Sequence, residues 1–130
     1  MKRLLCLPLS ILFCLLAVRC SDETATRRLA MLDAAGRLLP TDADSASQML
    51  AGIPQPEELG NRDFARWCML CGRSTDYTHA DTLHIHQWER AQKWIDKHGS
   101  PEERAEVGLF LGRAYAEDRE WDLAMQTYTE

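Results

Sequence analysis

The sequence predicts an all-α fold in which about six helices pack as antiparallel pairs. Three observations lead to this prediction. Leu and Ala dominate the apolar residues while Val and Ile are few, which favours helix over sheet. No segment alternates apolar and polar residues with period two, so no strand is expected. The apolar residues of several segments instead recur at steps of three and four.

The clearest such segment is residues 105–130, which we interpret as two short helices joined by a polar turn at residues 116–120. Gly112 and Ala124 are small enough to let the two backbones approach closely. Larger side chains at helical spacing are expected to fill the space around them, namely Leu111, Tyr115, Trp121 and Tyr128.

The chain before this segment also divides into helices. The first is predicted at residues 24–39, because Pro40 stops it. Residues 41–44 offer N-cap candidates for a second, short helix at residues 45–53. The Pro-Gln-Pro stretch at residues 54–56 is then the clearest internal boundary.

Three more helix boundaries follow from local signals. A third helix is predicted at residues 57–75. Asp81 is a plausible N-cap for a fourth helix that ends at His98, with Gly99 as its C-cap. The Ser-Pro-Glu-Glu stretch at residues 100–103 is a capped start for the fifth.

The chain contains an internal repeat. Residues 65–73 align with residues 105–113, and the Ala, Gly and Arg of the two segments are identical at an offset of 40 residues. Helices three and four therefore form one repeat, and helices five and six form the next. The leading pair, helices one and two, is a degenerate repeat or a cap.

Charge excludes one class of partner. Three of the 15 basic residues lie among the first 20 residues, which hold no acid, so the remainder carries 12 basic and 20 acidic residues. An acidic body argues against nonspecific nucleic-acid binding, which depends on neutralising phosphates. We expect no nucleic-acid partner for this segment.

Residues 1–20 have the pattern of a targeting segment. A basic start precedes an apolar stretch at residues 4–18, which is short for a membrane span of about 20 residues but suits a secretory signal core. Cys20 and the polar residues after it resemble the lipoprotein signal of bacteria, although Arg19 stands where that pattern has Gly, Ala or Ser. The resemblance implies lipidation of Cys20, which becomes the mature N-terminus. An ordinary signal peptide or an uncleaved anchor are the alternatives.

The pattern of residues 105–130 resembles the tetratricopeptide repeat, in which Leu-Gly and Tyr on one helix precede Ala and an aromatic residue on the next. Gly108 stands where that repeat has its first aromatic residue. The resemblance implies a right-handed superhelical array of antiparallel helix pairs.

The whole layout resembles tetratricopeptide-repeat lipoproteins and sensor-regulators of Gram-negative gut and oral bacteria. The resemblance rests on residues 43–50, 65–70, 81–83 and 97–99. It implies a lipoprotein signal peptide at residues 1–20, an N-terminal helix pair at residues 21–53 and two repeats at residues 57–130, the last of them incomplete. Because members of this group usually carry further repeats, we expect this chain to be the N-terminal piece of something longer, or a truncated gene product.

The Trp67-Cys68-Met69-Leu70-Cys71 stretch looks like a thioredoxin-type redox motif. A redox motif of this kind lies at the start of a helix that follows a strand. Here it falls inside a predicted helix, and the internal alignment assigns both cysteines to packing positions. We therefore interpret them as core residues, with a structural disulfide, a thiol sensor or thiol redox chemistry as the alternatives.

Histidine and tryptophan offer two weaker possibilities. His84 and His86 cannot share an ion on a helix that begins at Asp81, because residues two apart point about 200° from each other. A weak metal site with His79 and Asp81 in a loop remains open. The four tryptophans are expected to pack between helices, or else to form a stacking surface for a ligand; they are Trp67, Trp88, Trp94 and Trp121. We expect no enzyme activity, cofactor or metal.

What remains is a surface for another protein or peptide. In the repeat family the first helix of each pair lines a concave groove. That resemblance assigns seven residues to a partner-binding groove: Arg66, Met69, Arg73, Glu106, Leu109, Arg113 and Glu117. Its arginines either hold acidic groups of a partner or pair with neighbouring acids of this chain.

The sequence thus predicts an exported protein–protein interaction scaffold, anchored to a membrane as a lipoprotein that faces the periplasm or the cell surface. One alternative is the N-terminal sensing part of a larger signal-transduction or transcription regulator. Another alternative is a thiol redox protein that uses Cys68 and Cys71.

Overall fold

The computed structural model describes residues 6–78 and 82–130, with side chains from residue 22 onward. This part of the chain contains six α-helices, one short 3-10 helix and no strand, which confirms the all-α class. The elements are α1 (Cys6–Leu38), α2 (Ala43–Ala51), η1 (Pro56–Glu58), α3 (Asn61–Thr78), α4 (Ile85–His98), α5 (Pro101–Glu117) and α6 (Trp121–Thr129).

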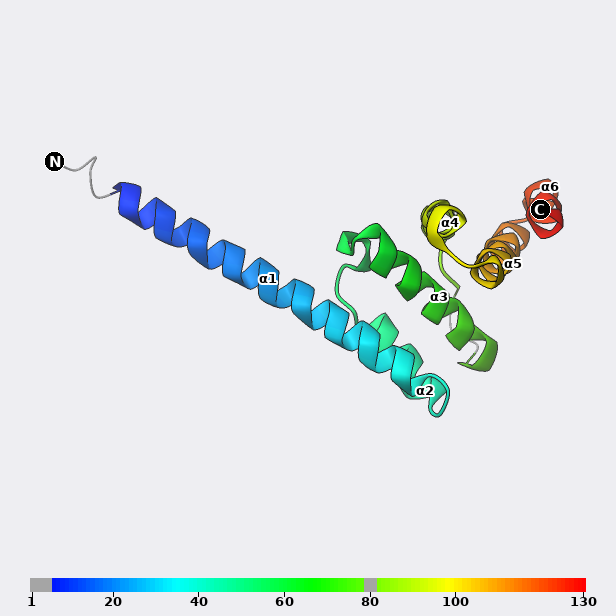
Figure 1. Cartoon of the computed structure of the whole chain (residues 1–130), viewed down its shortest axis with the longest axis horizontal. Helices are drawn as coiled ribbons and strands as arrows, with labels where there is room; N and C mark the ends of the chain where they lie inside the picture. Colours follow the sequence, from blue (N-terminus) through cyan, green and yellow to red (C-terminus); the bar gives the residue numbers. More distant parts are fainter. Residues whose placement is uncertain (1–5, 79–81) are drawn as a thin grey trace.

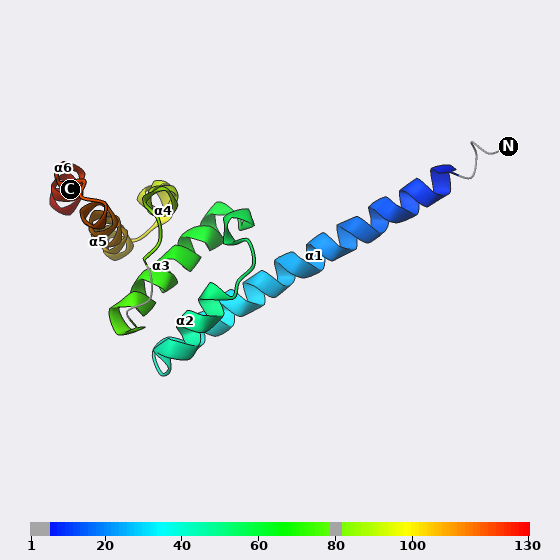
Figure 2. The same cartoon turned by 180° about the vertical axis from the view of Figure 1, so that it is seen from behind.

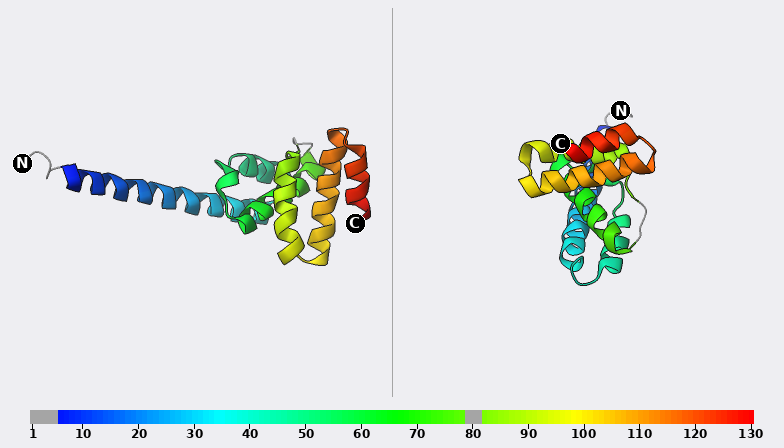
Figure 3. Two further views of the ribbon diagram at one scale, coloured as in Figure 1. Left: turned by 90° about the horizontal axis from the view of Figure 1, so that it is seen from above. Right: turned by 90° about the vertical axis from the view of Figure 1, so that its right-hand side faces the viewer.

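Each helix packs mainly on its neighbours along the chain. Helices α4, α5 and α6 lie side by side at one end of the molecule (Figure 3), and α3 lies between them and the α1–α2 pair (Figure 1). The N-terminal end of α1 extends well beyond the other helices, as the view from behind also shows (Figure 2). Such a sequential arrangement is stabilised chiefly by contacts between neighbouring elements.

A single apolar core runs through α1 to α5. Its fully buried side chains include Leu32 of α1, Leu50 of α2, Phe64 of α3 and Leu111 of α5. Burying one side chain of this size stabilises the fold by about 1.5–3 kcal/mol. The apolar side chains that recur at helical spacing are therefore the ones whose burial stabilises the fold.

The first helix is longer than predicted. It begins at Cys6 rather than at residue 24, and it ends at Leu38. Residues 1–5 of the expected targeting segment lie outside the described residues. Pro8 does not prevent this helix, because it lies in the first turn, where a backbone N–H has no helical partner.

The prediction of one helix at residues 57–75 is wrong. Residues Pro56–Glu58 form the separate helix η1, and α3 begins only at Asn61. The cause is a buried arginine of α1. The Nε of Arg28 donates to the carbonyl of Pro54 at 2.7 Å, and Nη2 donates to Gln55 at 3.0 Å and to Glu58 at 2.8 Å. This segment bends around a guanidinium more than 25 residues away in sequence, which local helix signals do not report.

The predicted N-cap of the fourth helix is also corrected. The helix α4 begins at Ile85, and His84 is its N-cap. Asp81, which the sequence favoured, lies outside the described residues. The side chain of Gln87 explains the later start, because it accepts from the backbone N–H of His84 at 2.9 Å and donates to Glu57 at 2.7 Å.

Other caps agree with the sequence. Asp42 accepts from the N–H of Ser45 at 3.0 Å and caps α2. Ser100 and Glu103 form a reciprocal capping box at the start of α5, with distances of 2.8 and 3.1 Å.

The 40-residue repeat recurs in the packing. A Cβ on Gly72 would meet the ring of Trp88, and a Cβ on Gly112 would meet the ring of Tyr128, 40 residues later in both cases. Two ion pairs show the same equivalence. Asp33 of α1 pairs with Arg66 of α3, and 40 residues later Arg73 of α3 pairs with Glu106 of α5, so the acid and the base have changed places. The internal alignment therefore describes real equivalence of position.

Candidate functional site

A hollow of about 540 Å³ lies between α1, α3, α4 and the start of α5. Its lining is rich in arginine, so we call it the arginine groove. The residues that line it are Asp33, Gly36, Arg37, Arg62, Ala65, Arg66, Met69, Leu70, Arg73, Trp94, Ile95 and Glu103. Its volume lies within the range of about 300–1,000 Å³ that is usual for ligand sites.

One face of α3 supplies most of the polar lining. Arg62, Arg66, Met69 and Arg73 follow one another at steps of four, three and four, so they share a single helical stripe. From α1, Gly36 brings the two helices together. A Cβ at Gly36 would lie 3.4 Å from Nη2 of Arg66 and 3.6 Å from Leu70.

Two of the four arginines are neutralised within the chain. Arg66 pairs with Asp33, and its hydrogen bond holds the pKa of that carboxyl below its usual value. Arg73 makes a bidentate pair with Glu106, with both N–O distances at 2.7 Å. The expectation that groove arginines pair with neighbouring acids is therefore met by Arg73 and Glu106.

The other two arginines have no such partner. Arg37 and Arg62 form no hydrogen bond or ion pair within the described part of the chain, although the charge of Arg37 also contributes to the lowered pKa of Asp33. The groove thus combines two uncommitted guanidinium groups with the apolar side chains of Met69 and Trp94. An arrangement of this kind can bind a carboxylate-bearing segment that also carries apolar side chains.

The structure distributes the seven predicted groove residues over three hollows. Arg66, Met69 and Arg73 line the arginine groove, and Glu106 touches it through Arg73. Leu109 lines a second hollow, and Arg113 and Glu117 line a third of about 210 Å³. The separation arises because Arg113 pairs with Asp76 at 2.7 Å, near the C-terminal end of α3 and away from Arg66.

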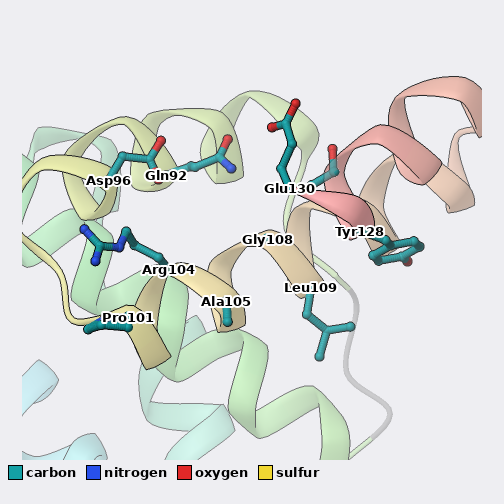
Figure 4. A pocket seen from close by; sticks show the side chains of 10 residues that line it. Gln92, Asp96, Pro101, Arg104, Ala105, Gly108, Leu109, Tyr128 and Glu130 are labelled. Carbon is teal, nitrogen blue, oxygen red and sulfur yellow. The ribbon is translucent and has the colours of Figure 1, made fainter.

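The second hollow, of about 550 Å³, lies between α4, α5 and α6 (Figure 4). Gln92 and Asp96 project from α4, while Tyr128 and Glu130 come from the C-terminal end. The lining of this hollow carries both acidic and basic side chains, such as Asp96 and Arg104.

Sequence reasoning missed Arg37, Arg62 and Trp94 as groove residues. Arg62 lies one helical turn before Arg66, so the spacing of four residues indicates that it belongs to the same stripe of α3. Arg37 belongs to a helix that was not expected to contribute. Trp94 was assigned to the core, but it is only partly buried.

The two cysteines lie in the middle of α3, away from its N-terminus. Cys68 is fully buried and Cys71 is partly buried, and both are free thiols. Burial raises the pKa of Cys71 to about 12 and also raises the pKa of Cys68. Because the thiolate is the reactive form, burial of this kind lowers the reactivity of both thiols at neutral pH.

The histidines and tryptophans differ in part from expectation. The rings of His84 and His86 stack at 5.7 Å, because His84 precedes α4 in an extended conformation. His79 lies outside the described residues, and the described ones contain no group of three or more potential metal ligands. Trp67 and Trp88 are buried, but Trp121, which was expected to fill a helix interface, is 61% exposed. Ala124 of α6 is buried and the ring of Tyr128 lies against Gly112 of α5, whereas Trp121, at the start of α6, is left exposed.

No helix in the described residues is both long and apolar enough to cross a membrane. A scan against protein-family models found no match to this chain. Searches of curated proteins and of solved structures also found no match.

Proposed function

We propose that this chain is an exported scaffold for protein–protein interaction, held at a membrane by a lipid on Cys20, and that the arginine groove binds an acidic segment of its partner. The observation that carries this proposal is the pair of uncommitted arginines, Arg37 and Arg62, beside the apolar side chains of Met69 and Trp94. A partner carboxylate at either arginine would make charge-assisted hydrogen bonds, and nearby apolar side chains would be buried against the tryptophan.

A tetratricopeptide-like, right-handed superhelical stacking of the helix pairs is part of the proposal. It is supported by the recurrence of equivalent contacts at a 40-residue offset and by the packing of each helix on its chain neighbours. Arrays of this type present extended surfaces that suit peptides and partner domains. The absence of a reactive thiol geometry at Cys68 and Cys71 makes a binding role the better supported one.

The membrane anchor is supported by the sequence of residues 1–23, in which an apolar stretch leads to Cys20 and then to polar residues. Metabolic labelling of the chain with a palmitate analogue in a Gram-negative host tests it. We expect label on the wild-type chain and none on Cys20→Ala. Equal label on both would contradict lipidation at this residue.

Binding to the groove is tested with the full chain in mild detergent and a fluorescent dodecapeptide of alternating Glu and Leu. We expect binding that weakens as salt rises, because the contacts are charge-assisted. Arg37→Glu and Arg62→Glu should each weaken it by about tenfold, which corresponds to about 1.4 kcal/mol.

The matched control is Arg27→Glu, which makes the same charge change on α1 at an exposed residue outside the groove lining. We expect it to leave the affinity unchanged. If Arg27→Glu weakens binding as much as Arg37→Glu does, the peptide responds to overall charge and the groove is not its site.

A further inference from the structure

The two groove arginines that pair within the chain are held differently. Arg66 donates one hydrogen bond to Asp33, from Nη1, whereas Arg73 donates two to Glu106, from Nε and Nη2. The side chain of Asp33 is 51% exposed, and that of Glu106 is 28% exposed. An exposed pair with one hydrogen bond contributes little, because water screens both charges, while a bidentate pair is stronger and fixed in geometry. The Asp33–Arg66 pair is therefore the one that a ligand can open more readily.

Asp33 occupies a part of the arginine groove where a carboxylate is stabilised. It lies one helical turn before Arg37 on α1 and pairs with Arg66 of α3, and all three residues line the groove. The hydrogen bond from Arg66 and the charge of Arg37 both lower the pKa of the Asp33 carboxyl. The chain thus places its own carboxylate where the acidic ligand of the groove would bring one.

Arg66 has further donors to offer a ligand. A guanidinium group carries five N–H donors, and the pair with Asp33 uses one of them in the part of the chain that the structure describes. Gly36 of α1 has no side chain to cover Nη2 of Arg66, from which a Cβ at this residue would lie 3.4 Å away. When the exposed Asp33 turns toward solvent, Arg66 can hold a partner carboxylate through two of its N–H groups.

We propose that Asp33 is an internal competitor for the acidic ligand of the arginine groove: a partner carboxylate displaces it from Arg66, and Arg66 then holds the ligand together with Arg37. This inference rests on the proposed function, because it concerns the same groove and the same class of ligand. It adds a third binding arginine and a contact that regulates affinity. An uncharged apolar segment cannot replace Asp33 on Arg66, so the internal pair also favours acidic ligands over neutral ones.

Removal of the competing charge tests the inference with the fluorescent Glu-Leu dodecapeptide and the full chain in mild detergent. Asp33→Asn should strengthen binding by about threefold to fivefold, because the amide neither competes for Arg66 nor repels the ligand. The matched control is Asp44→Asn, which removes the same charge from an exposed residue of α2 outside the groove lining. We expect it to leave the affinity unchanged.

Two double variants separate the two internal pairs without changing the net charge. Asp33→Asn with Arg66→Gln should bind the peptide about tenfold more weakly than Asp33→Asn alone, because it removes the released arginine. Arg73→Gln with Glu106→Gln should bind like the wild type, because the bidentate pair stays closed when the ligand binds. All four side chains are partly exposed, so the variants should keep the helical circular dichroism spectrum of the wild type.

The outcomes distinguish this inference from the proposed function. If the wild type binds and Arg37→Glu weakens it, but Asp33→Asn binds no more tightly, Asp33 does not compete and only the inference fails. Equal gains in Asp33→Asn and Asp44→Asn would also overturn it, because the peptide would then respond to net charge. If neither the wild type nor Asp33→Asn binds, the proposed function of the groove fails and the inference falls with it.

Discussion

Replacement of Gly72 by alanine tests how closely α3, α4 and α5 approach one another. Alanine is normally the better residue inside a helix, by about 1 kcal/mol. The backbone of Gly72 does not need glycine, because no glycine in the described chain has a positive φ. Its Cβ, however, would lie 2.7 Å from two ring atoms of Phe110 and 2.8 Å from Trp88.

These contacts determine the sign of the effect. The two rings are buried and stack on each other, so neither can move aside independently. Overpacking a core by one methyl group commonly costs about 1–3 kcal/mol. With the propensity gain of about 1 kcal/mol subtracted, Gly72→Ala should destabilise the fold by up to about 2 kcal/mol.

Two other glycines provide a graded comparison. A Cβ on Gly108 would come no closer than 3.8 Å to the carbonyl of Thr127, so Gly108→Ala should stabilise the fold by up to about 1 kcal/mol. A Cβ on Gly112 would overlap the ring of Tyr128, which is partly exposed and can swing outward. Gly112→Ala should therefore fall between the other two.

Urea denaturation followed by circular dichroism gives the three free energies of unfolding. A thermal scan gives a second readout, in which Tm should shift by about 4 °C for each kcal/mol of change in the free energy of unfolding. If Gly72→Ala is as stable as Gly108→Ala, then α3 does not approach Phe110 and Trp88 this closely, and the packing argument for the glycine is refuted.

Three further predictions concern individual side chains. Arg28→Met should destabilise the fold by about 2–3 kcal/mol in urea denaturation, since it leaves the carbonyl of Pro54 without its charged donor; an effect below about 0.5 kcal/mol would contradict this role. The pKa of Asp33 is lowered by Arg66, so this carboxylate stabilises the fold above about pH 4 and the contribution is lost as the pH falls further. The stability difference between wild type and Asp33→Asn should accordingly shrink below about pH 4, and a constant difference would count against the ion pair. Because burial raises the pKa of Cys71 to about 12, iodoacetamide at pH 8 should modify it only in urea, as mass spectrometry can localise; rapid labelling of the folded chain would revive thiol chemistry.

Much of the fold was predictable because its signals are local. The capping box of Ser100 and Glu103 joins residues three apart, and it forms where the sequence predicts it. The repeat equivalence of residues 65–73 and 105–113 is likewise visible in both sequence and packing. These features depend on a few neighbouring residues or on a recurring pattern, so no tertiary information is needed to find them.

The candidate site was only partly predictable. Arg66, Met69 and Arg73 were assigned to a groove by the resemblance to the tetratricopeptide repeat, and all three line the arginine groove. Arg37 was missed, because its place in the groove depends on how α1 crosses α3 at Gly36. A helix crossing is set by the packing of two surfaces, which a pattern within one helix does not contain.

The sequence by itself determined the all-α class, the end of α4, the starts of α5 and α6, and the 40-residue repeat, because propensity, capping and periodicity act within a few residues. Only the tertiary structure decided where Arg28 bends the chain after Pro54, which groove arginines meet an acid, and that Trp121 stays exposed. Each of these depends on groups that are distant in sequence and come together only when the helices pack, so their free energies belong to the packed molecule rather than to any one segment.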